Sequence, residues 1–422
     1  MKVVCFGPGP IFKGGISNYN TSLAKALDKM GVETHIVSWT QQYPAIIPRD
    51  FKDKTSKTDL LAGTNIKVQY ITNYNNPFTW RETYRYIVSL QPDKVIFQWS
   101  IALQGLPLAY IAKWLKKHKT IEVIFDLHFV IQKEHSALDK FFTKKALQHA
   151  HTFIAHAYKT VDELREVFPQ KVLHVNETGE RKADITNVIK LFHPVYDLFK
   201  PDPNFDIAQY KQEHQLKKYV FFYFGFIRKY KGLHNAIKAF HQLASQRDDV
   251  SFLICGESFW NTLDNSKLST KIKTFIFGIA KKILLKQQDN EQNYNPLTLI
   301  DELNLRDKVM LVNEYIPNED VHKYFQVADC GILFYEYATP SGVESLNYNF
   351  KLPILATRVG HFPETIKEGY NGYLAEPEDI NSMTSVMQKF IDQPIDRANV
   401  EESAQDMSWD NYAKAAIRSN II

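Results

Sequence analysis

The sequence has little cysteine and no long apolar run. Its three cysteines, Cys5, Cys255 and Cys330, are far apart, which excludes a disulfide framework and a cysteine metal motif and favours a reducing compartment. No window holds about 20 uninterrupted apolar residues, so we expect no transmembrane helix. The apolar part of the N-terminus is too short for a signal peptide. The cysteine usage therefore predicts a cytoplasmic protein. The net charge of only +4 predicts that the protein binds no nucleic acid.

Apolar segments typical of buried strands alternate with helical patterns along the whole chain. Strands are predicted at 2–6, 32–39, 68–71, 94–99, 121–127, 151–156, 190–193, 219–224, 250–255, 309–312, 330–335 and 353–357. This alternation predicts an α/β fold of two facing, doubly wound Rossmann-like domains. The polar segment 197–218 serves as the linker, so the domains are placed at 1–196 and 197–408.

The segment 219–240, YVFFYFGFIRKYKGLHNAIKAF, joins a buried strand to a helix through a basic turn. The strand ends at Gly225, and Arg228 and Lys231 follow before the helical apolar spacing begins. This order places two cations and a helix N-terminus at the carboxyl edge of a sheet, where such sheets bind ligands and where phosphate is favoured. The alternative is a pair of solvated loop cations.

Two features of the first half are also expected at the carboxyl edge of a parallel sheet. Gly14 and Gly15 follow the first strand without the G-x-G-x-x-G spacing of dinucleotide-binding proteins. They let the backbone approach a ligand closely or simply form the turn. His128 ends a central strand, where a titratable side chain faces the ligand crevice. The alternative for His128 is a hydrogen-bonded structural histidine.

An inserted segment at about 260–295 interrupts the alternation in the second half. Within it, residues 268–286 place apolar side chains on one helical face and lysines on the others. A basic amphipathic helix of this kind suits an anionic membrane surface. The alternative is a helix that packs on its own domain and leaves its lysines in water.

Together, the segments FGPGPIFKGGISNY, FGFIRKYKGL, NEYIPNEDV and SGVESLNYNFKLPILATRVGHFPE resemble glycosyltransferase family 4. Members of this family are retaining, nucleotide-sugar-dependent enzymes with the GT-B fold. The resemblance implies an acceptor-side domain at 1–196 and a nucleotide-sugar-binding domain at 197–408. It also implies a closing helix at 409–422 that crosses back to the first domain.

The resemblance assigns roles to individual residues. Arg228 and Lys231 would hold the donor diphosphate and stabilise the leaving nucleotide, which removes the need for a metal or other cofactor. His128 would be the active-site histidine near the donor sugar. The other implied donor contacts are Gly14, Gly15, Glu257, Tyr315, Ile316, Ser341, Gly342, Val343 and Glu344.

The chain departs from the family in its pair of glutamates. Glu336 and Glu344 have the family's separation of eight positions. The flanking predicted strands instead favour a register two residues later, at Ala338 and Leu346. Either a short insertion has shifted the motif or this chain has lost it.

The expected function is transfer of a sugar, with retention, from a nucleotide-diphosphate sugar to a glycan or lipid-linked acceptor. We expect UDP as the nucleotide, a role in cell-surface polysaccharide or glycolipid synthesis, and peripheral attachment to the inner face of the plasma membrane. Two alternatives are a sugar-nucleotide epimerase or phosphorylase on the same fold and a non-catalytic, transferase-like scaffold.

Overall fold

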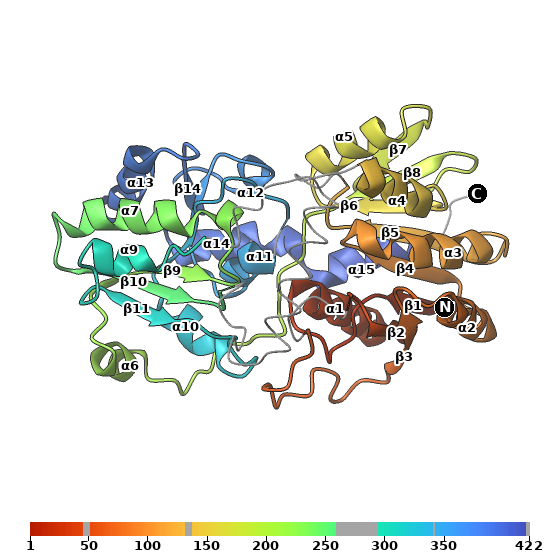
Figure 1. Ribbon diagram of the computed structural model, residues 1–422, viewed down its shortest axis with the longest axis horizontal. Helices are drawn as coiled ribbons and strands as arrows, with labels where there is room; N and C mark the ends of the chain where they lie inside the picture. The colour runs from red at the N-terminus through yellow and green to blue at the C-terminus, as the bar shows by residue number, and fades with distance from the viewer. Residues whose placement is uncertain (45–50, 131–136, 259–293, 341, 419–422) are drawn as a thin grey trace. The chain divides into compact units, whose positions relative to one another are not determined.

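The computed structural model describes residues 1–44, 51–130, 137–258, 294–340 and 342–418. The chain forms two compact units (Figure 1). Unit 1 comprises Met1–Lys54, Asp59–Pro194 and Asp406–Ile422, and unit 2 comprises Thr55–Thr58 and Val195–Gln405. The chain thus leaves unit 1 after Pro194 and returns to it at Asp406.

Unit 1 is built on a sheet of eight parallel strands in the order β3-β2-β1-β4-β5-β6-β8-β7. The strands are β1 (Lys2–Phe6), β2 (Glu33–Gln41), β3 (Lys67–Asn73), β4 (Lys94–Trp99), β5 (Glu122–Leu127), β6 (Thr152–Ala155), β7 (Leu173–Asn176) and β8 (Thr186–Lys190). Its central strands are apolar and almost fully buried because helices cover the sheet.

The helices of unit 1 are α1 (Gly15–Lys29), α2 (Pro77–Ser89), α3 (Gly105–Leu115), α4 (Ala137–Leu147), α5 (Tyr158–Val167) and α15 (Trp409–Ile417). Helix α15 packs on α1, and the Trp409 and Tyr19 rings lie 4.9 Å apart. The buried Arg181 guanidinium donates to the carbonyl oxygens of Ala415 and Ala416 at 2.8 and 2.7 Å. These bonds satisfy the end of the helix, so the last helix is anchored in unit 1.

Unit 2 contains a sheet of six parallel strands in the order β11-β10-β9-β12-β13-β14. The strands are β9 (Tyr219–Phe224), β10 (Val250–Cys255), β11 (Val309–Val312), β12 (Cys330–Leu333), β13 (Ile354–Thr357) and β14 (Gly372–Ala375). The helices are α6 (Ile207–Glu213), α7 (Leu233–Ala244), α9 (Thr298–Glu302), α10 (Val321–Val327), α11 (Gly342–Asn349), α12 (Phe362–Thr365), α13 (Ile380–Asp392) and α14 (Arg397–Ser403). The strand order reverses between β9 and β12, the switch point at which doubly wound sheets bind ligands.

The predicted α/β fold of doubly wound units is confirmed, with local corrections. The strand predicted at 190–193 is β8, Thr186–Lys190, because Pro194 and the residues before it leave the sheet. Helix α2 begins at Pro77, since the Asn76 side chain caps it and Pro77 occupies its first turn. The segment predicted as a linker, 197–218, contains helix α6. Because this helix buries none of its residues, its sequence shows no apolar pattern that would have predicted it.

The predicted amphipathic segment 268–286 lies outside the described residues. Among the residues that the structure describes, no helix is long and apolar enough to cross a membrane.

Candidate active site

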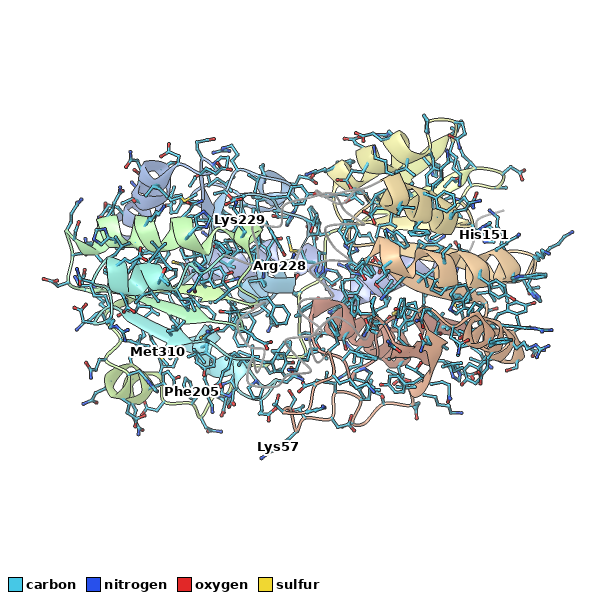
Figure 2. The ribbon with its side chains drawn as sticks, viewed as in Figure 1. Lys57, His151, Phe205, Arg228, Lys229 and Met310 are labelled. Atoms are coloured by element: carbon cyan, nitrogen blue, oxygen red, sulfur yellow. The ribbon has the colours of Figure 1, made fainter. Side chains whose placement is uncertain are left out.

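The turn after β9 holds the two predicted phosphate-binding cations at the switch point of unit 2. Gly225 has a φ of 101°, and Gly232 has a φ of 63°. A Cβ atom on Gly232 would lie 2.0 Å from the Phe334 carbonyl oxygen, so only glycine allows the loop to pack on the chain that follows β12. Arg228, which Figure 2 labels, lies within the turn. The conformation of the loop is therefore set by these two glycines and by close packing of its backbone on the chain after β12.

Lys231 is a buried cation directed at this turn. The residue is 8% exposed, and its Nζ atom lies 3.0 Å from the position of a Cβ on Gly225. Burial, followed by the charge of Arg228, lowers the pKa of Lys231 to about 8. In the described part of the chain no carboxylate forms an ion pair with it. A buried ammonium of this kind is stabilised by an anionic ligand.

The N-terminus of α11 lies against the same turn. The Val343 Cγ2 atom is 3.3 Å from the position of a Cβ on Gly225, and Gly342 begins the helix. Backbone N–H groups and the positive end of the helix dipole therefore lie near Lys231. Ser341, predicted to join them, lies outside the described residues. This cluster has the charge and the donors that a diphosphate requires.

A histidine that sequence analysis did not identify lies beside the cluster. His234, in the first turn of α7, has its Nε2 atom 3.4 Å from Oε1 of Glu336. Burial, with the charges of Lys238 and Lys229, lowers the pKa of His234 to about 4. The imidazole is therefore neutral near pH 7. His234 could have been proposed as a site residue from the sequence, because it follows the predicted basic turn directly.

Glu344 is held by the fold itself. Its carboxylate contacts Nε2 of His361 and accepts a hydrogen bond of 2.5 Å from the Thr365 hydroxyl. The residue is buried, so its carboxylate is already engaged inside unit 2. Ala338 and Leu346, at the alternative register, are buried in the apolar core.

The remaining predicted donor contacts follow neighbouring strands of the same sheet. The Glu257 carbonyl oxygen, after β10, accepts a 3.0 Å hydrogen bond from the Ile227 amide. Tyr315 and Ile316 follow β11, and the Ile316 side chain is buried. Because all the strands are parallel, these residues share the carboxyl edge with Arg228 and Lys231.

His128 lies at the carboxyl end of β5 in unit 1. The residue is 6% exposed, and its Nε2 atom is 2.8 Å from the side-chain oxygen of Gln98. Burial lowers the pKa of His128 to about 3, against the opposing charge of Asp126. The ring is therefore neutral at physiological pH and acts as a hydrogen-bonding group rather than as a cation.

Two further histidines lie beside His128, and sequence analysis did not assign them to a site. His156 follows β6, His193 lies shortly after β8, and one ring nitrogen from each of the three histidines lies within 4.8 Å of the others. The strands β5, β6 and β8 are neighbours in the sheet. Each histidine ends or follows a predicted strand, but the sequence does not give the strand order that brings the three together.

A hydrogen-bonded network supports this histidine cluster. Nε2 of His156 lies 2.9 Å from the buried Asp126 carboxylate and 3.1 Å from the hydroxyls of Tyr19 and Tyr412. Tyr412 comes from α15, so the last helix contributes to the network. Three imidazoles at this spacing could accept a transition metal, but the Asp126 and tyrosine contacts already give His156 a structural role.

Gly14 and Gly15 lie at the start of α1, and no atom of the described residues lies within 4 Å of the position of a Cβ on Gly14. Together with His128 they belong to unit 1, whereas all the other predicted site residues belong to unit 2. Within each unit the predicted residues lie at the carboxyl edge of the sheet.

Comparisons with known proteins agree with this arrangement. The family model described as Glycosyl transferases group 1 matches residues 204–407, and that described as Glycosyltransferase Family 4 matches residues 13–179. Comparison with curated proteins gives no match.

Solved structures with a similar fold cover nearly the whole chain. A glycosyltransferase from Rickettsia africae has a TM-score of 0.63 at 15% identity, over 99% of each chain. HepE from Anabaena, solved with UDP and glucose, has a TM-score of 0.60 at 15% identity, over 98% of this chain and 95% of its own. Sucrose-phosphate synthase from Thermosynechococcus elongatus has a TM-score of 0.58 at 16% identity, over 98% of this chain and 94% of its own.

The fold, the order of the motifs and the family models lead to one assignment. The chain belongs to glycosyltransferase family 4 and is a glycosyltransferase with the GT-B fold.

Proposed function

We propose that the protein transfers a sugar, with retention of configuration, from a UDP-sugar to a glycan or lipid-linked acceptor. The observation that carries this proposal is Lys231, a buried cation beside the N-terminus of α11 at the switch point of unit 2. HepE, which shares the fold, was solved with UDP and with UDP-glucose. We further propose a role in cell-surface polysaccharide or glycolipid synthesis.

Arg228 and Lys231 would act on the leaving group. As the bond between sugar and phosphate breaks, negative charge gathers on the departing diphosphate. Fixed cations in a site prepared in advance stabilise this charge more in the transition state than in the ground state. The two side chains would then do what a divalent metal does in other transferases, and we propose that the reaction requires no metal.

We propose retention because the family resemblance implies it, and two buried carboxylates in or beside the predicted site residues indicate by which route it proceeds. Asp126 is fully buried behind His128 and paired with His156, and Glu344 is paired with His361 and Thr365. Neither carboxylate is placed to form a covalent glycosyl intermediate. We therefore favour attack from the face of the leaving group, assisted by the donor phosphate, with neutral His128 positioning the sugar by hydrogen bonding.

We also propose peripheral attachment to an anionic membrane, and one surface of unit 1 supports this. Helices α3 and α4 pack side by side. Four exposed apolar residues and three exposed lysines lie on these helices, and a fourth exposed lysine, Lys117, lies just after α3: Leu106, Trp114, Leu138, Phe141, Lys113, Lys144, Lys145 and Lys117. Apolar side chains among cations are typical of proteins that bind the interface of an anionic bilayer. We name these eight residues the α3–α4 face.

The donor proposal is tested by titrating the purified protein with UDP, GDP, ADP and CMP. We expect UDP to raise the melting temperature, because a ligand at about 100 times its Kd adds roughly 2.7 kcal/mol of stability. Arg228→Ala should abolish the rise. Lys217→Ala, an exposed lysine of unit 2 away from the turn, is the control. A response that survives Arg228→Ala would reject the assigned site.

A further inference from the structure

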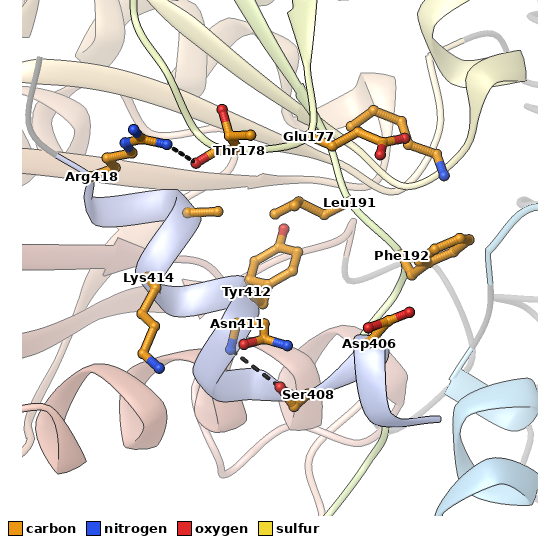
Figure 3. A pocket seen from close by; sticks show the side chains of 12 residues that line it. Glu177, Thr178, Leu191, Phe192, Asp406, Ser408, Asn411, Tyr412, Lys414 and Arg418 are labelled. Atoms are coloured by element: carbon orange, nitrogen blue, oxygen red, sulfur yellow. Dashed lines mark hydrogen bonds between the residues drawn. The ribbon is translucent and has the colours of Figure 1, made fainter. Parts of the chain in front are cut away.

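Unit 1 contains a pocket of about 660 Å³ between the end of β8 and helix α15 (Figure 3). All its lining residues belong to unit 1, whereas Arg228 and Lys231 belong to unit 2. Leu191 and Phe192 form one wall, and Asn411, Tyr412 and Ala415 form the other. The volume falls within the range of about 300–1,000 Å³ that is typical of small-molecule sites.

Lys190 gives this pocket its chemical character. The residue is 3% exposed and contributes to the lining. Its Nζ atom lies 3.8 Å from the centre of the Phe192 ring and 4.9 Å from that of Tyr158. Within the described residues its ammonium has neither an ion pair nor a hydrogen bond. Ring faces stabilise a cation only in part, so a buried ammonium in this setting favours an anionic ligand.

The rim of the pocket carries charges of both signs. Arg418 donates a hydrogen bond of 2.9 Å to the Thr178 carbonyl oxygen, and Lys414 is exposed beside it. The acidic rim residues are Glu177, which accepts a 2.9 Å hydrogen bond from the Tyr158 hydroxyl, and Asp406, which is exposed. Both acids thus lie at the rim, while the buried charge within the pocket is positive.

The apolar and polar lining defines the rest of the ligand. Leu191, Phe192 and Tyr412 offer apolar and aromatic surface, on which the C–H face of a sugar ring packs. Asn411 and Ser408 offer hydrogen-bonding groups for hydroxyls. The Tyr412 hydroxyl also contacts His156 of the histidine cluster at 3.1 Å. A ligand in the pocket would therefore touch the network that supports His128.

We propose that this pocket binds an anionic sugar, one that carries a phosphate or a carboxylate, with Lys190 as its counter-ion. Two sources share this chemistry: a charged group on the acceptor, and a free sugar phosphate that acts as an effector. The idea that the ligand is a charged acceptor rests on the proposed transferase function. The idea that the pocket binds an anionic sugar does not.

Calorimetric titration of the full chain in saturating UDP tests the proposal, because UDP fills the donor site. The probes are glucose 1-phosphate, glucuronate, inorganic phosphate and glucose. We expect the two anionic sugars to bind more tightly than phosphate, and glucose not to bind. Lys190→Met should weaken their binding about tenfold or more, since a charge-assisted contact is lost. Lys190→Arg should retain it, and Lys67→Met, an exposed control in β3, should leave it unchanged.

A second variant tests the pocket without changing a buried residue. Asn411 is exposed on α15, so Asn411→Trp should fill the pocket, block the anionic sugars and leave UDP binding intact. The proposal is wrong if the anionic sugars fail to bind the wild type. It is also wrong if they bind Lys190→Met and Asn411→Trp as tightly as they bind the wild type. Failure of UDP to bind would instead reject the donor proposal, and the sugars would then be titrated without it.

Kinetics separate the two sources once binding is found. For an acceptor subsite, Lys190→Met raises the KM of a charged acceptor and leaves that of an uncharged one unchanged. For an effector site, glucose 1-phosphate changes kcat in the wild type but not in Lys190→Met. Either result supports a role of the pocket in sugar transfer. If the anionic sugars bind but neither kinetic effect is seen, the pocket has no role in transfer.

Discussion

The ammonium nitrogen of Lys231 lies 3.0 Å from the position that a Cβ atom on Gly225 would occupy. The two residues are six positions apart in the sequence, and the turn between them returns the cation to the end of β9. Glycine is therefore required at 225 both by its φ of 101° and by the cation beside it.

Gly225→Ala should weaken donor binding and lower stability together. A side chain at a positive φ costs about 1 kcal/mol or more, and the new methyl group would displace Lys231. Unfolding in urea and UDP titration measure the two effects. Gly369→Ala is the matched control, because Gly369 has a φ of 75° but its nearest atom, on Tyr373, is 4.0 Å away. Equal UDP affinity in the two variants would show that Gly225 does not position the cation.

Replacing Lys231 or Arg228 by a neutral side chain should lower turnover by about two orders of magnitude or more. Each contact to the developing charge is worth roughly 3 kcal/mol in the transition state. Steady-state rates of Lys231→Met and Arg228→Gln test this, with Lys217→Met as the control. Unchanged rates in both site variants would refute their catalytic role.

The pKa of Lys231 predicts opposite effects of pH on binding and on stability. Since burial lowers this pKa from 10.5 to about 8, the folded protein releases a proton between pH 8 and 10.5 that the unfolded chain keeps. The free energy of unfolding of the unliganded protein should therefore rise over this window. UDP binding should weaken over the same window because the cation is lost. Both trends should disappear in Lys231→Met, and their persistence there would assign them to another group.

His128→Ala should impair transfer and preserve the fold. Because burial lowers the pKa of His128 to about 3, the side chain stays neutral throughout the range in which most enzymes work. We therefore expect kcat to show no titration from His128 between about pH 5 and 8. Stability should fall as the pH drops from 6.5 towards 3, since the unfolded chain binds the proton more readily. Circular dichroism and pH–rate profiles, with His214→Ala as control, measure these effects, and a normal kcat in His128→Ala would contradict the role.

The α3–α4 face should carry binding to anionic vesicles. Trp114→Ala with Phe141→Ala should reduce cosedimentation with vesicles that contain phosphatidylglycerol, and Lys144→Glu with Lys145→Glu should nearly abolish it. Neutral vesicles test whether binding depends on the charge of the lipid. A deletion of residues 268–286 tests whether the segment predicted from the sequence binds the membrane instead. If only the deletion reduces binding, the α3–α4 face is not the membrane surface.

Sequence patterns were sufficient for the fold and for the basic turn. Buried parallel strands are apolar on both faces, so β9 and β10 stand out as continuous runs. The Arg228–Lys231 turn follows directly from where β9 ends. By contrast, β7 has four half-buried residues and α6 buries none, so neither leaves a hydrophobic pattern.

The histidine cluster and the Lys190 pocket required the structure. His128, His156 and His193 are brought together only by the order β5-β6-β8, in which β7 is displaced to the sheet edge. Lys190 lies at the end of β8 and resembles any strand-terminal lysine in sequence. Its special environment comes from Tyr158 and from α15, which are distant in the chain.

The most direct test of the account is the calorimetric titration of UDP into the wild type, Lys231→Met and Lys217→Met at pH 7 and pH 9. We predict tight binding by the wild type and by Lys217→Met at pH 7, weaker binding by both at pH 9, and weak, pH-independent binding by Lys231→Met. Equal affinity of the wild type and Lys231→Met at pH 7 would contradict the claim that this buried cation forms the donor diphosphate site.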